Sequence, residues 1–400
     1  MPPIASRARL MPSSPIRKLA PLADEARRRG IQVHHLNIGQ PDLPTPPMLL
    51  DTFRKQELSV LAYGHSAGLP EYREALARYY RSHGIDVTSQ EVMVTTGGSE
   101  AILFALLAVT DPGDEVVVPE PFYTNYNGFA VEAGVKVVPV TSDPDEGYCL
   151  PSAAEIMAAL SPRTKAILLC NPSNPTGWVY TWEELARLKE LARSHDLFLI
   201  SDEAYREFVY DGTEHHSLMH LAGVEDRAIV VDSISKRFNA CGARVGALVT
   251  KNSEVLDSAL RFGQARLCPP TFEQLAATAA LGLPQEYFDS VRDEYRQRRD
   301  VAFAALEEMP GVVAHRPRGA FYTMVRLPVV DADAFCSWLL RDFSSGGETV
   351  MLAPGNGFYA NPGLGKQEVR LAFVINQDAT RRAMEILAEA LEKYPGRATD

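Results

Sequence analysis

The sequence lacks the features of a disulfide-rich or metal-binding protein. Its 400 residues include only five cysteines, and no two of them form a Cys-x-x-Cys pair. Scattered cysteines in odd number are typical of reduced thiols, so we expect neither a disulfide framework nor a metal site. They are Cys149, Cys170, Cys241, Cys268 and Cys336. His65, His215 and His216 lack metal-like partners and are expected to be surface polar groups.

A surplus of basic residues and a long apolar run are also absent. The chain has 40 lysines and arginines against 51 aspartates and glutamates, a net charge of −11. Nucleic acids and anionic membranes bind to positive surface, so we expect neither as a partner. No apolar run approaches the roughly 18 residues that a membrane-spanning helix needs. The first residues are basic without an apolar segment behind them, so we expect no signal peptide and a cytoplasmic location.

What the sequence does contain is a regular alternation of strand and helix patterns. From residue 91 onward, short apolar runs rich in β-branched residues alternate with helical patterns such as 99–109 and 181–196. Continuous apolar strands separated by helices predict an α/β fold with a mainly parallel central sheet flanked by helices. The predicted strands are 92–96, 115–119, 135–140, 166–170, 197–201, 228–232 and 245–250.

The length of the chain predicts more than one domain. A long charged helix at 287–309 is expected to connect two of them, and the strand and helix patterns beyond it predict a smaller α+β domain. Ser14 and Pro15 are typical of a helix start, so we expect a helix from Ser14 to Gly30. The predicted division is an N-terminal arm that joins the small domain (1–45), a large domain (46–295) and the small C-terminal domain (296–400).

Unusual side chains follow five of the predicted strands. In open parallel sheets, ligands bind outside the carboxyl ends of the strands, so these residues are expected to lie together. The five segments supply a glycine-rich turn, an aromatic ring, an amide, a carboxylate and an amine. They are Gly97-Gly98-Ser99-Glu100, Glu120-Pro121-Phe122-Tyr123, NPSNPTG (171–177), SDEAY (201–205) and DSISKR (232–237).

Three of these segments have two interpretations each. The turn at Gly98 and Ser99 leaves amides free at a helix start, which suits a phosphate, but a tight turn with Ser99 as N-cap would have the same sequence. Asn174 could present its amide to a ligand oxygen or belong to an ordinary turn. Tyr123 could lie flat on a ligand ring or pack in the core.

Asp202 and Lys236 are the residues whose side chains most strongly suggest a chemical role. A carboxylate that ends an apolar strand needs a partner, which a protonated ring nitrogen, a helix N-terminus or an arginine could supply. A loop lysine is usually a solvated charge. Burial beside a second cation, such as Arg237 or Arg244, would instead lower the pKa of the Lys236 amine and make it a nucleophile toward carbonyls.

Taken together, these groups describe one cofactor, pyridoxal 5'-phosphate. Glycines, serines and Arg244 would hold its phosphate, and Tyr123 would cover its ring. Asp202 would pair with the ring nitrogen, Asn174 would meet the phenolic oxygen, and Lys236 would form a Schiff base with the aldehyde.

Longer motifs occur in a fixed order along almost the whole chain. They are NIGQPD (37–42), YGHSAGLPEYREALA (63–77), TGGSEAI (96–102), PFYTNY (121–126), NPSNPTG (171–177), SDEAYREFVY (201–210), SISKRFNACGARVG (233–246) and VRLAF (369–373). Through these motifs the chain resembles, over residues 13–395, the class I/II aminotransferases of fold type I, which are aspartate aminotransferase-like enzymes that use pyridoxal phosphate. The resemblance implies that the large domain binds this cofactor.

The resemblance implies a role for each matching residue. The catalytic residues would be Lys236, Asp202 and Tyr205. The cofactor-binding residues would be Gly98, Ser99, Tyr123, Asn174, Asp202, Tyr205, Ser233, Ser235, Lys236 and Arg244. The α-carboxylate of the substrate would be bound by Gly39, Asn174 and Arg370. Tyr63 would reach the phosphate in the other subunit, which implies a homodimer with composite active sites.

The implied function is the transfer of an amino group from an L-amino acid, aspartate-like or other, to a 2-oxo acid such as 2-oxoglutarate, by a ping-pong mechanism. One position departs from the family pattern. Bacterial aspartate aminotransferases of the nearest type usually carry a lysine directly after the paired glycines, where it recognises the distal carboxylate, and here that residue is Ser99. Either another cation binds that carboxylate, with Arg266 and Arg318 as candidates on charge alone, or the substrate is not acidic.

Other activities stay open at the level of the sequence. An aromatic or branched-chain aminotransferase and a carbon–sulfur β-lyase would use the same lysine and aspartate. A regulator that only senses the cofactor would carry an N-terminal DNA-binding module, and the residues before Val33 are too few for one.

Overall fold

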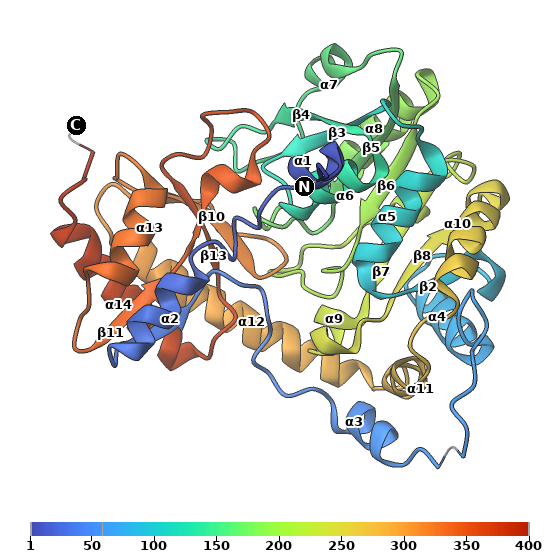
Figure 1. Ribbon diagram of the computed structural model, residues 1–400, viewed down its shortest axis with the longest axis horizontal. Coiled ribbons are helices and arrows are strands. Elements are labelled where there is room, and N and C mark those ends of the chain that lie inside the picture. Colours follow the sequence, from blue (N-terminus) through green and yellow to red (C-terminus); the bar gives the residue numbers. More distant parts are fainter. Residues whose placement is uncertain (1, 58, 399–400) are drawn as a thin grey trace.

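The computed structural model describes residues 2–57 and 59–398, and its largest element is a seven-stranded sheet (Figure 1). The strands are β2 Val92–Thr95, β3 Glu115–Glu120, β4 Lys136–Thr141, β5 Thr164–Cys170, β6 Phe198–Asp202, β7 Ala228–Ser233 and β8 Gly246–Thr250. They lie in the order β2-β8-β7-β6-β5-β3-β4. β3 to β7 pair in parallel, whereas β8 is antiparallel to β7 and to β2. The predicted α/β class with a mainly parallel sheet is confirmed.

Helices cover both faces of this sheet, which is why its strands are apolar at consecutive positions. In β5, Ala166 and Leu168 pack into one core with α5, α6 and α10, and Ile167 and Leu169 pack into a second core with α4, α8 and α11. The helices around the sheet are α3 Pro47–Arg54, α4 Pro70–Ser82, α5 Gly97–Val109, α6 Asn125–Ala133, α7 Ala153–Ala159, α8 Trp182–Ser194, α9 Ile234–Arg237, α10 Ser253–Arg266 and α11 Thr271–Ala280.

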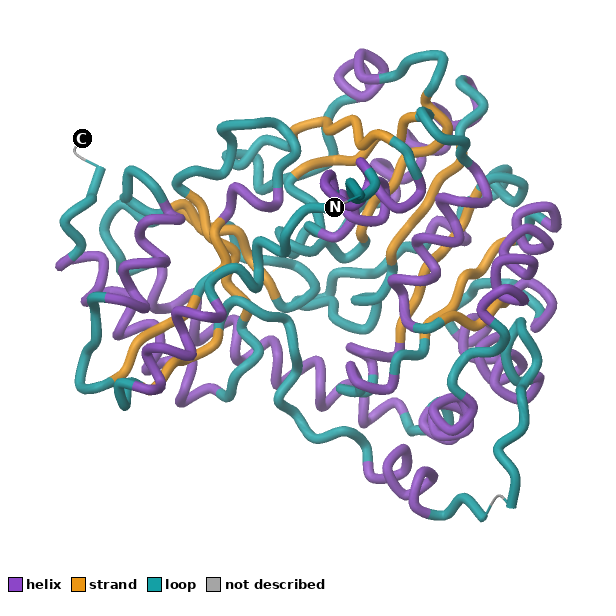
Figure 2. Tube along the Cα trace, in the orientation of Figure 1, coloured by secondary structure: helices purple, strands orange, loops and turns teal. Residues whose placement is uncertain are grey.

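The C-terminal part of the chain forms a second group of strands, seen apart from the first in Figure 2. Its elements are α12 Gln285–Leu306, β9 Val313–Ala314, β10 Tyr322–Arg326, α13 Ala332–Arg341, β11 Glu348–Met351, β12 Ala353–Pro354, β13 Glu368–Ala372 and α14 Gln377–Lys393. An antiparallel sheet has the order β12-β13-β10-β9, and β11 pairs in parallel with the N-terminal strand β1, Gln32–His35. The long helix α12 runs between the two groups (Figure 1).

The proposed domain boundaries near residues 45 and 295 stay predictions. Among the described residues, no helix combines the length and the apolar character needed to cross a membrane.

The predicted helix from Ser14 to Gly30 is wrong in its first part. The N-terminal helices are α1 Ser6–Leu10 and α2 Ala20–Arg28, and residues 14–19 form turns. Pro15 packs so closely on Gly357 that a Cβ there would lie 2.2 Å from the proline ring. Ile16 packs against a separate small core that contains Phe358 and Tyr359, and not along the apolar face of α2. Tertiary packing therefore overrides the local helix signal.

A buried carboxylate, that of Glu120, ties the end of β3 to the C-terminal part. Its Oε2 accepts hydrogen bonds from the backbone N–H groups of Ala360 (2.7 Å) and Asn361 (3.2 Å). Its Oε1 accepts from the Asn361 side chain (2.7 Å) and from Thr141 Oγ1 (2.8 Å). Because Glu120 is fully buried, these four donors replace the water that the carboxylate loses on folding.

We expect Glu120→Ala to lower the free energy of unfolding by about 2–4 kcal/mol, since it removes the four hydrogen bonds that the buried carboxylate accepts. The midpoint of urea unfolding would report the loss. Glu308→Ala is the matched control, because Glu308 is exposed, and surface changes of that kind stay within about 0.5 kcal/mol. Equal midpoints for the two variants would contradict the role given to Glu120.

Candidate active site

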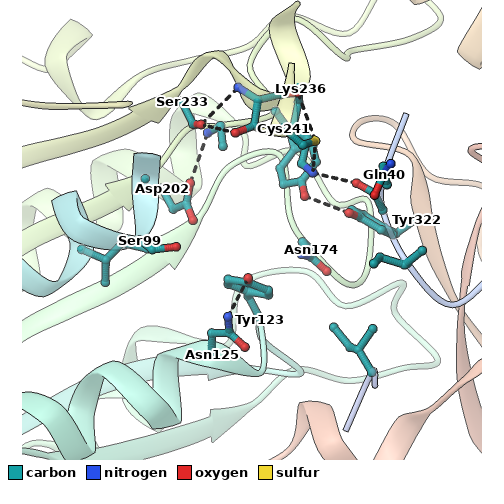
Figure 3. A pocket seen from close by; sticks show the side chains of 18 of the residues that line it. Gln40, Ser99, Tyr123, Asn125, Asn174, Asp202, Ser233, Lys236, Cys241 and Tyr322 are labelled. Atoms are coloured by element: carbon teal, nitrogen blue, oxygen red, sulfur yellow. Dashed lines mark hydrogen bonds between the residues drawn. The ribbon is translucent and has the colours of Figure 1, made fainter. Parts of the chain in front are cut away.

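A cavity of about 500 Å³ opens at the carboxyl ends of the parallel strands. Apart from Tyr63 and the two candidates for a distal carboxylate, Arg266 and Arg318, every residue predicted to bind cofactor or substrate, or to take part in catalysis, lines it. Figure 3 shows Ser99, Tyr123, Asn174, Asp202 and Lys236 arranged around this space. Strand-end residues that are far apart in sequence meet here because parallel strands end at the same edge of the sheet.

Lys236 enters the cavity from the single-turn helix α9, directly after β7. Its Nζ donates hydrogen bonds to the Gly39 carbonyl oxygen (2.6 Å) and to Cys241 Sγ (3.4 Å). Burial lowers the pKa of the Lys236 amine, and the positive charges of Arg370 and Arg244 lower it further, whereas Cys241 opposes the shift. A lowered pKa raises the share of neutral amine, which is the nucleophilic form.

Arg237, one of the two cations considered from the sequence, is held in a separate buried cluster. Its Nη2 donates to Asp232 Oδ2 at 2.5 Å, and both side chains are only 2% exposed. Its guanidinium also lies 4.1 Å from the ring centroid of Tyr79. Neighbouring residues of a helical turn point in different directions, so Arg237 faces this buried cluster while Lys236 faces the cavity.

Asp202 ends β6 and is also buried. Its Oδ2 accepts a hydrogen bond from the Tyr126 hydroxyl (3.1 Å), and its Oδ1 accepts one from the Ala204 N–H (3.2 Å). Burial raises the pKa of the Asp202 carboxyl to about 6, and these hydrogen bonds oppose the rise. The carboxylate therefore remains largely ionised at neutral pH and would be stabilised by a cation in the cavity.

The first turn of α5 forms an anion-binding end of the cavity. Thr96, the N-cap of α5, makes no side-chain cap, so the first amides of the helix are free of a capping oxygen. Gly97 has φ +73°, and a Cβ there would lie 2.2 Å from Arg244 Nη2, so only glycine lets the guanidinium approach this closely. The expectation that Ser99 might be the N-cap does not hold.

Two serines and Arg244 complete this end. Ser233 Oγ donates to Ser235 Oγ (2.8 Å), and Arg244 Nη1 donates to the Cys241 carbonyl oxygen at 3.0 Å. Hydroxyls, a guanidinium and helix-start amides together are a donor set for a phosphate or another multiply charged anion.

Arg370 marks the opposite end. It is 1% exposed, and its Nη1 and Nη2 donate to Asn174 Oδ1 (2.8 Å) and to the Asn37 carbonyl oxygen (2.5 Å). Its Nε has no hydrogen-bond partner among the described residues. A buried guanidinium with donors to spare is suited to bind a carboxylate.

Tyr322 was not predicted from the sequence as a site residue. It comes from GAFYT, where an aromatic residue looks like an ordinary strand residue. Its hydroxyl lies 2.9 Å from that of Tyr205 and its ring centroid 4.4 Å from the Arg370 guanidinium. A Cβ on Gly39 would lie 1.5 Å from the Tyr322 hydroxyl, which explains why glycine occupies position 39.

Several other lining residues were missed, namely Arg17, Gln40, Asn125 and Cys241. Asn125 Nδ2 donates to the Tyr123 hydroxyl at 2.9 Å and so orients that ring. Cys241 lies within the SISKRFNACGARVG motif, so its position after Lys236 was the signal that could have identified it. Arg17 and Gln40 lie in loops, where sequence spacing does not indicate direction.

Three predicted residues lie outside the cavity. Tyr63 is 81% exposed. Arg266 pairs with Glu100 at 3.2 Å, and the Arg318 guanidinium lies 5.2 Å from the ring centroid of Trp178. Neither arginine lines the cavity.

His215 is not the surface group predicted from the sequence. Its side chain is only 9% exposed, and its Nε2 lies 3.1 Å from the Asn171 carbonyl oxygen. Burial lowers the pKa of His215 well below its usual value, and the Arg206 charge lowers it further.

Comparisons with known proteins point to one family. The profile of the family described as aminotransferase class I and II matches residues 31–387. The aspartate/prephenate aminotransferase of Thermus thermophilus is 34% identical over 372 residues, which cover 92% of this chain and 93% of that protein. The aromatic-amino-acid aminotransferase 2 of Thermococcus litoralis is 31% identical over 400 residues, 98% of each chain.

Solved structures agree with this. The alanine aminotransferase from Pyrococcus furiosus superposes with a TM-score of 0.90 at 31% identity, covering 98% of this chain and 100% of that one. The Thermus thermophilus aspartate aminotransferase with maleate gives a TM-score of 0.88 at 33% identity, with the same coverage.

The ion pair behind Lys236 generates a prediction about stability. We expect Arg237→Met to lower the free energy of unfolding by about 3–5 kcal/mol, because Asp232 would stay buried without its nearest cation. Adding Asp232→Asn should recover part of this loss, and urea unfolding of both single variants and the double variant would measure the coupling. If the losses of the single variants simply add, the pair does not hold α9 in place.

Proposed function

The chain belongs to the class I and II aminotransferases, and from this we propose that it moves an amino group from an L-amino acid to a 2-oxo acid with pyridoxal 5'-phosphate as cofactor. The family resemblance noted in the sequence is confirmed by the match over residues 31–387, and this family generally depends on that cofactor. One observation on this chain supports the proposal: the buried Lys236 amine, the buried Asp202 carboxylate and the free amides at the start of α5 share one cavity.

The residues of the cavity fit pyridoxal phosphate. Its phosphate would be held by Gly98, Ser99, Ser233, Ser235 and Arg244, where Gly97 leaves space for the guanidinium. The Asp202 carboxylate, which has no cation in hydrogen-bonding contact among the described residues, would pair with the protonated ring nitrogen. Tyr123, oriented by Asn125, would lie on the ring, and Asn174 and Tyr205 would bind the phenolic oxygen.

When bound, the cofactor supplies an aldehyde carbon that exchanges amino groups and a protonated ring that withdraws electrons from the substrate. Lys236 would hold the cofactor covalently. Once released, its Nζ would accept the proton from the α-carbon of the amino acid and would then donate it to the former aldehyde carbon of the cofactor. A lowered pKa suits the amine for this task, because a neutral base accepts the proton readily. Asp202 would keep the ring nitrogen protonated by its negative charge.

Arg370 would fix the orientation of the substrate. Its free Nε and its planar guanidinium can bind the α-carboxylate bidentately, with Gly39 and Asn174 beside it. Donor and acceptor would bind in turn at the same place, which gives a ping-pong cycle.

The substrate pair is a narrower question. The relatives are named for aspartate, prephenate, aromatic amino acids and alanine, and their names do not agree on one donor. We propose an L-amino acid donor and a 2-oxo acid acceptor such as 2-oxoglutarate. Release of ammonia and pyruvate from cystathionine without an acceptor would instead identify a β-lyase.

We also propose a homodimer with composite active sites. Tyr63 is 81% exposed and lies beside Val60 and Leu61, which are 73% and 59% exposed. Large apolar side chains in a row on a surface loop favour a protein contact. In a dimer, the Tyr63 hydroxyl would reach the phosphate in the partner subunit.

A half-reaction screen tests the proposed function. Wild-type protein loaded with cofactor should change its visible absorbance on addition of at least one amino acid, and the spectrum should return on addition of a 2-oxo acid. Lys236→Ala should abolish turnover while still binding the cofactor loosely, because the covalent attachment and the base are both lost. Lys251→Ala, a lysine outside the cavity, should behave like wild type. Near-normal transamination by Lys236→Ala would contradict the proposal.

Subunit mixing tests the composite site. Lys236→Ala and Tyr63→Ala chains, expressed together, should be more active than the two chains assayed apart, because one site of each hybrid dimer has both native residues. Activity of the mixture equal to the average of the separate chains would exclude a contribution of Tyr63 across subunits.

A further inference from the structure

The site as described lacks a group for the distal end of the substrate. Ser99 stands where the nearest bacterial aspartate aminotransferases usually carry a lysine, and its short hydroxyl cannot supply a charge. Arg266 and Arg318, the two replacements considered from the sequence, lie outside the cavity, one paired with Glu100 and the other against Trp178. A cation for a distal carboxylate would therefore have to come from another residue that lines the cavity.

Arg17 is such a cation. It lines the cavity and is exposed, so it lies at the rim. Among residues 2–57 and 59–398, its side chain makes neither an ion pair nor a hydrogen bond. Its positive charge acts on the same ring as the cavity arginines, since Arg370, Arg17 and Arg244 all oppose the rise that burial causes in the pKa of the Tyr123 hydroxyl.

The backbone around Arg17 is anchored on both sides. Before it, Pro15 packs on Gly357, and the Ile16 carbonyl oxygen accepts a hydrogen bond from Asn37 Nδ2 at 3.1 Å. After it, Lys18 pairs with Asp333, away from the cavity. These contacts are the reason that residues 14–19 are turns rather than helix, and they hold Arg17 at the cavity while its guanidinium stays free.

The charges of the cavity leave Arg17 without a counterion. The lining holds four cationic side chains, Arg17, Lys236, Arg244 and Arg370, and a single carboxylate, Asp202. With the proposed cofactor and substrate present, Arg244 would face the phosphate and Arg370 the α-carboxylate. Lys236 would be covalently bound or act as the base, and Asp202 would face the ring nitrogen. One positive charge remains, and it lies on Arg17.

We propose that Arg17 is a specificity-determining residue that binds the second carboxylate of a dicarboxylic substrate, either the amino acid or the 2-oxo acid. This inference rests on the proposed function. The planar guanidinium at the rim takes the task that a lysine after the paired glycines would otherwise have, and it comes from the turns before α2 instead of the start of α5. A substrate with an uncharged side chain would leave the charge of Arg17 unused.

The test compares matched pairs of ligands. Aspartate and 2-aminobutyrate have the same chain length, and only aspartate has a distal carboxylate. In Arg17→Ala, kcat/KM for aspartate should fall about 10- to 100-fold, as expected for one charge-assisted contact, while that for 2-aminobutyrate changes little. Arg17→Lys should restore part of the loss. Arg28→Ala is the control, because it removes an exposed positive charge of α2 that lies outside the cavity.

A binding experiment gives an independent readout. Succinate has two carboxylates and no amino group, so it cannot react, and calorimetric titration of the cofactor-loaded protein measures its affinity directly. Arg17→Ala should weaken succinate binding by a similar factor, and Arg28→Ala should not. Arg370→Leu should weaken aspartate and 2-aminobutyrate alike, because it would bind the carboxylate that both share.

Two results would overturn the inference: equal losses for aspartate and 2-aminobutyrate in Arg17→Ala, or unchanged succinate affinity in that variant. Either result leaves the aminotransferase proposal intact. If the wild-type protein reacts with no amino acid at all, the proposed function fails, and the succinate titration still decides whether Arg17 binds a second carboxylate.

Discussion

The position of the Lys236 amine depends on the rigidity of one short helical turn. α9 follows β7 without a loop, and Ser233 caps it by accepting a hydrogen bond from the Ser235 N–H. On the far side, Arg237 is paired with Asp232, which also accepts from the Tyr80 hydroxyl at 2.8 Å. The flexible lysine side chain is thus attached to a backbone that is held on both sides, which is the preorganisation that catalysis by orientation requires.

Burial gives the neighbouring groups their chemical character. Asp202 and Arg370 are nearly free of solvent, and in such surroundings charges act on one another more strongly than in water. These groups lose their hydration when the protein folds, and not when the ligand binds. A ligand with complementary charges therefore meets charged groups that are already oriented. The same reasoning explains why the sheet edge, and not a surface loop, carries the cavity.

Much of this arrangement could be predicted from the sequence because it depends on strands. Asp202 and Lys236 each follow an apolar run, and the ends of parallel strands meet in space, so their proximity followed from the pattern. Tyr322 could not be found this way, since its role comes from a contact with Gly39, which lies 283 residues earlier in the sequence. The position of Arg17 could not be predicted for a similar reason. The segment has a helical sequence pattern, but the packing of Pro15 on Gly357 makes it a turn.

The close approach of Gly39 and Tyr322 limits how this protein can diverge. The hydroxyl of Tyr322 occupies the volume where any larger residue at position 39 would place its first side-chain carbon. A substitution at position 39 is therefore tolerated only after the tyrosine has been replaced, so the order of change at the two positions is fixed. Evolution toward new substrates in this lineage should leave that corner of the cavity untouched and proceed through the residues at the rim.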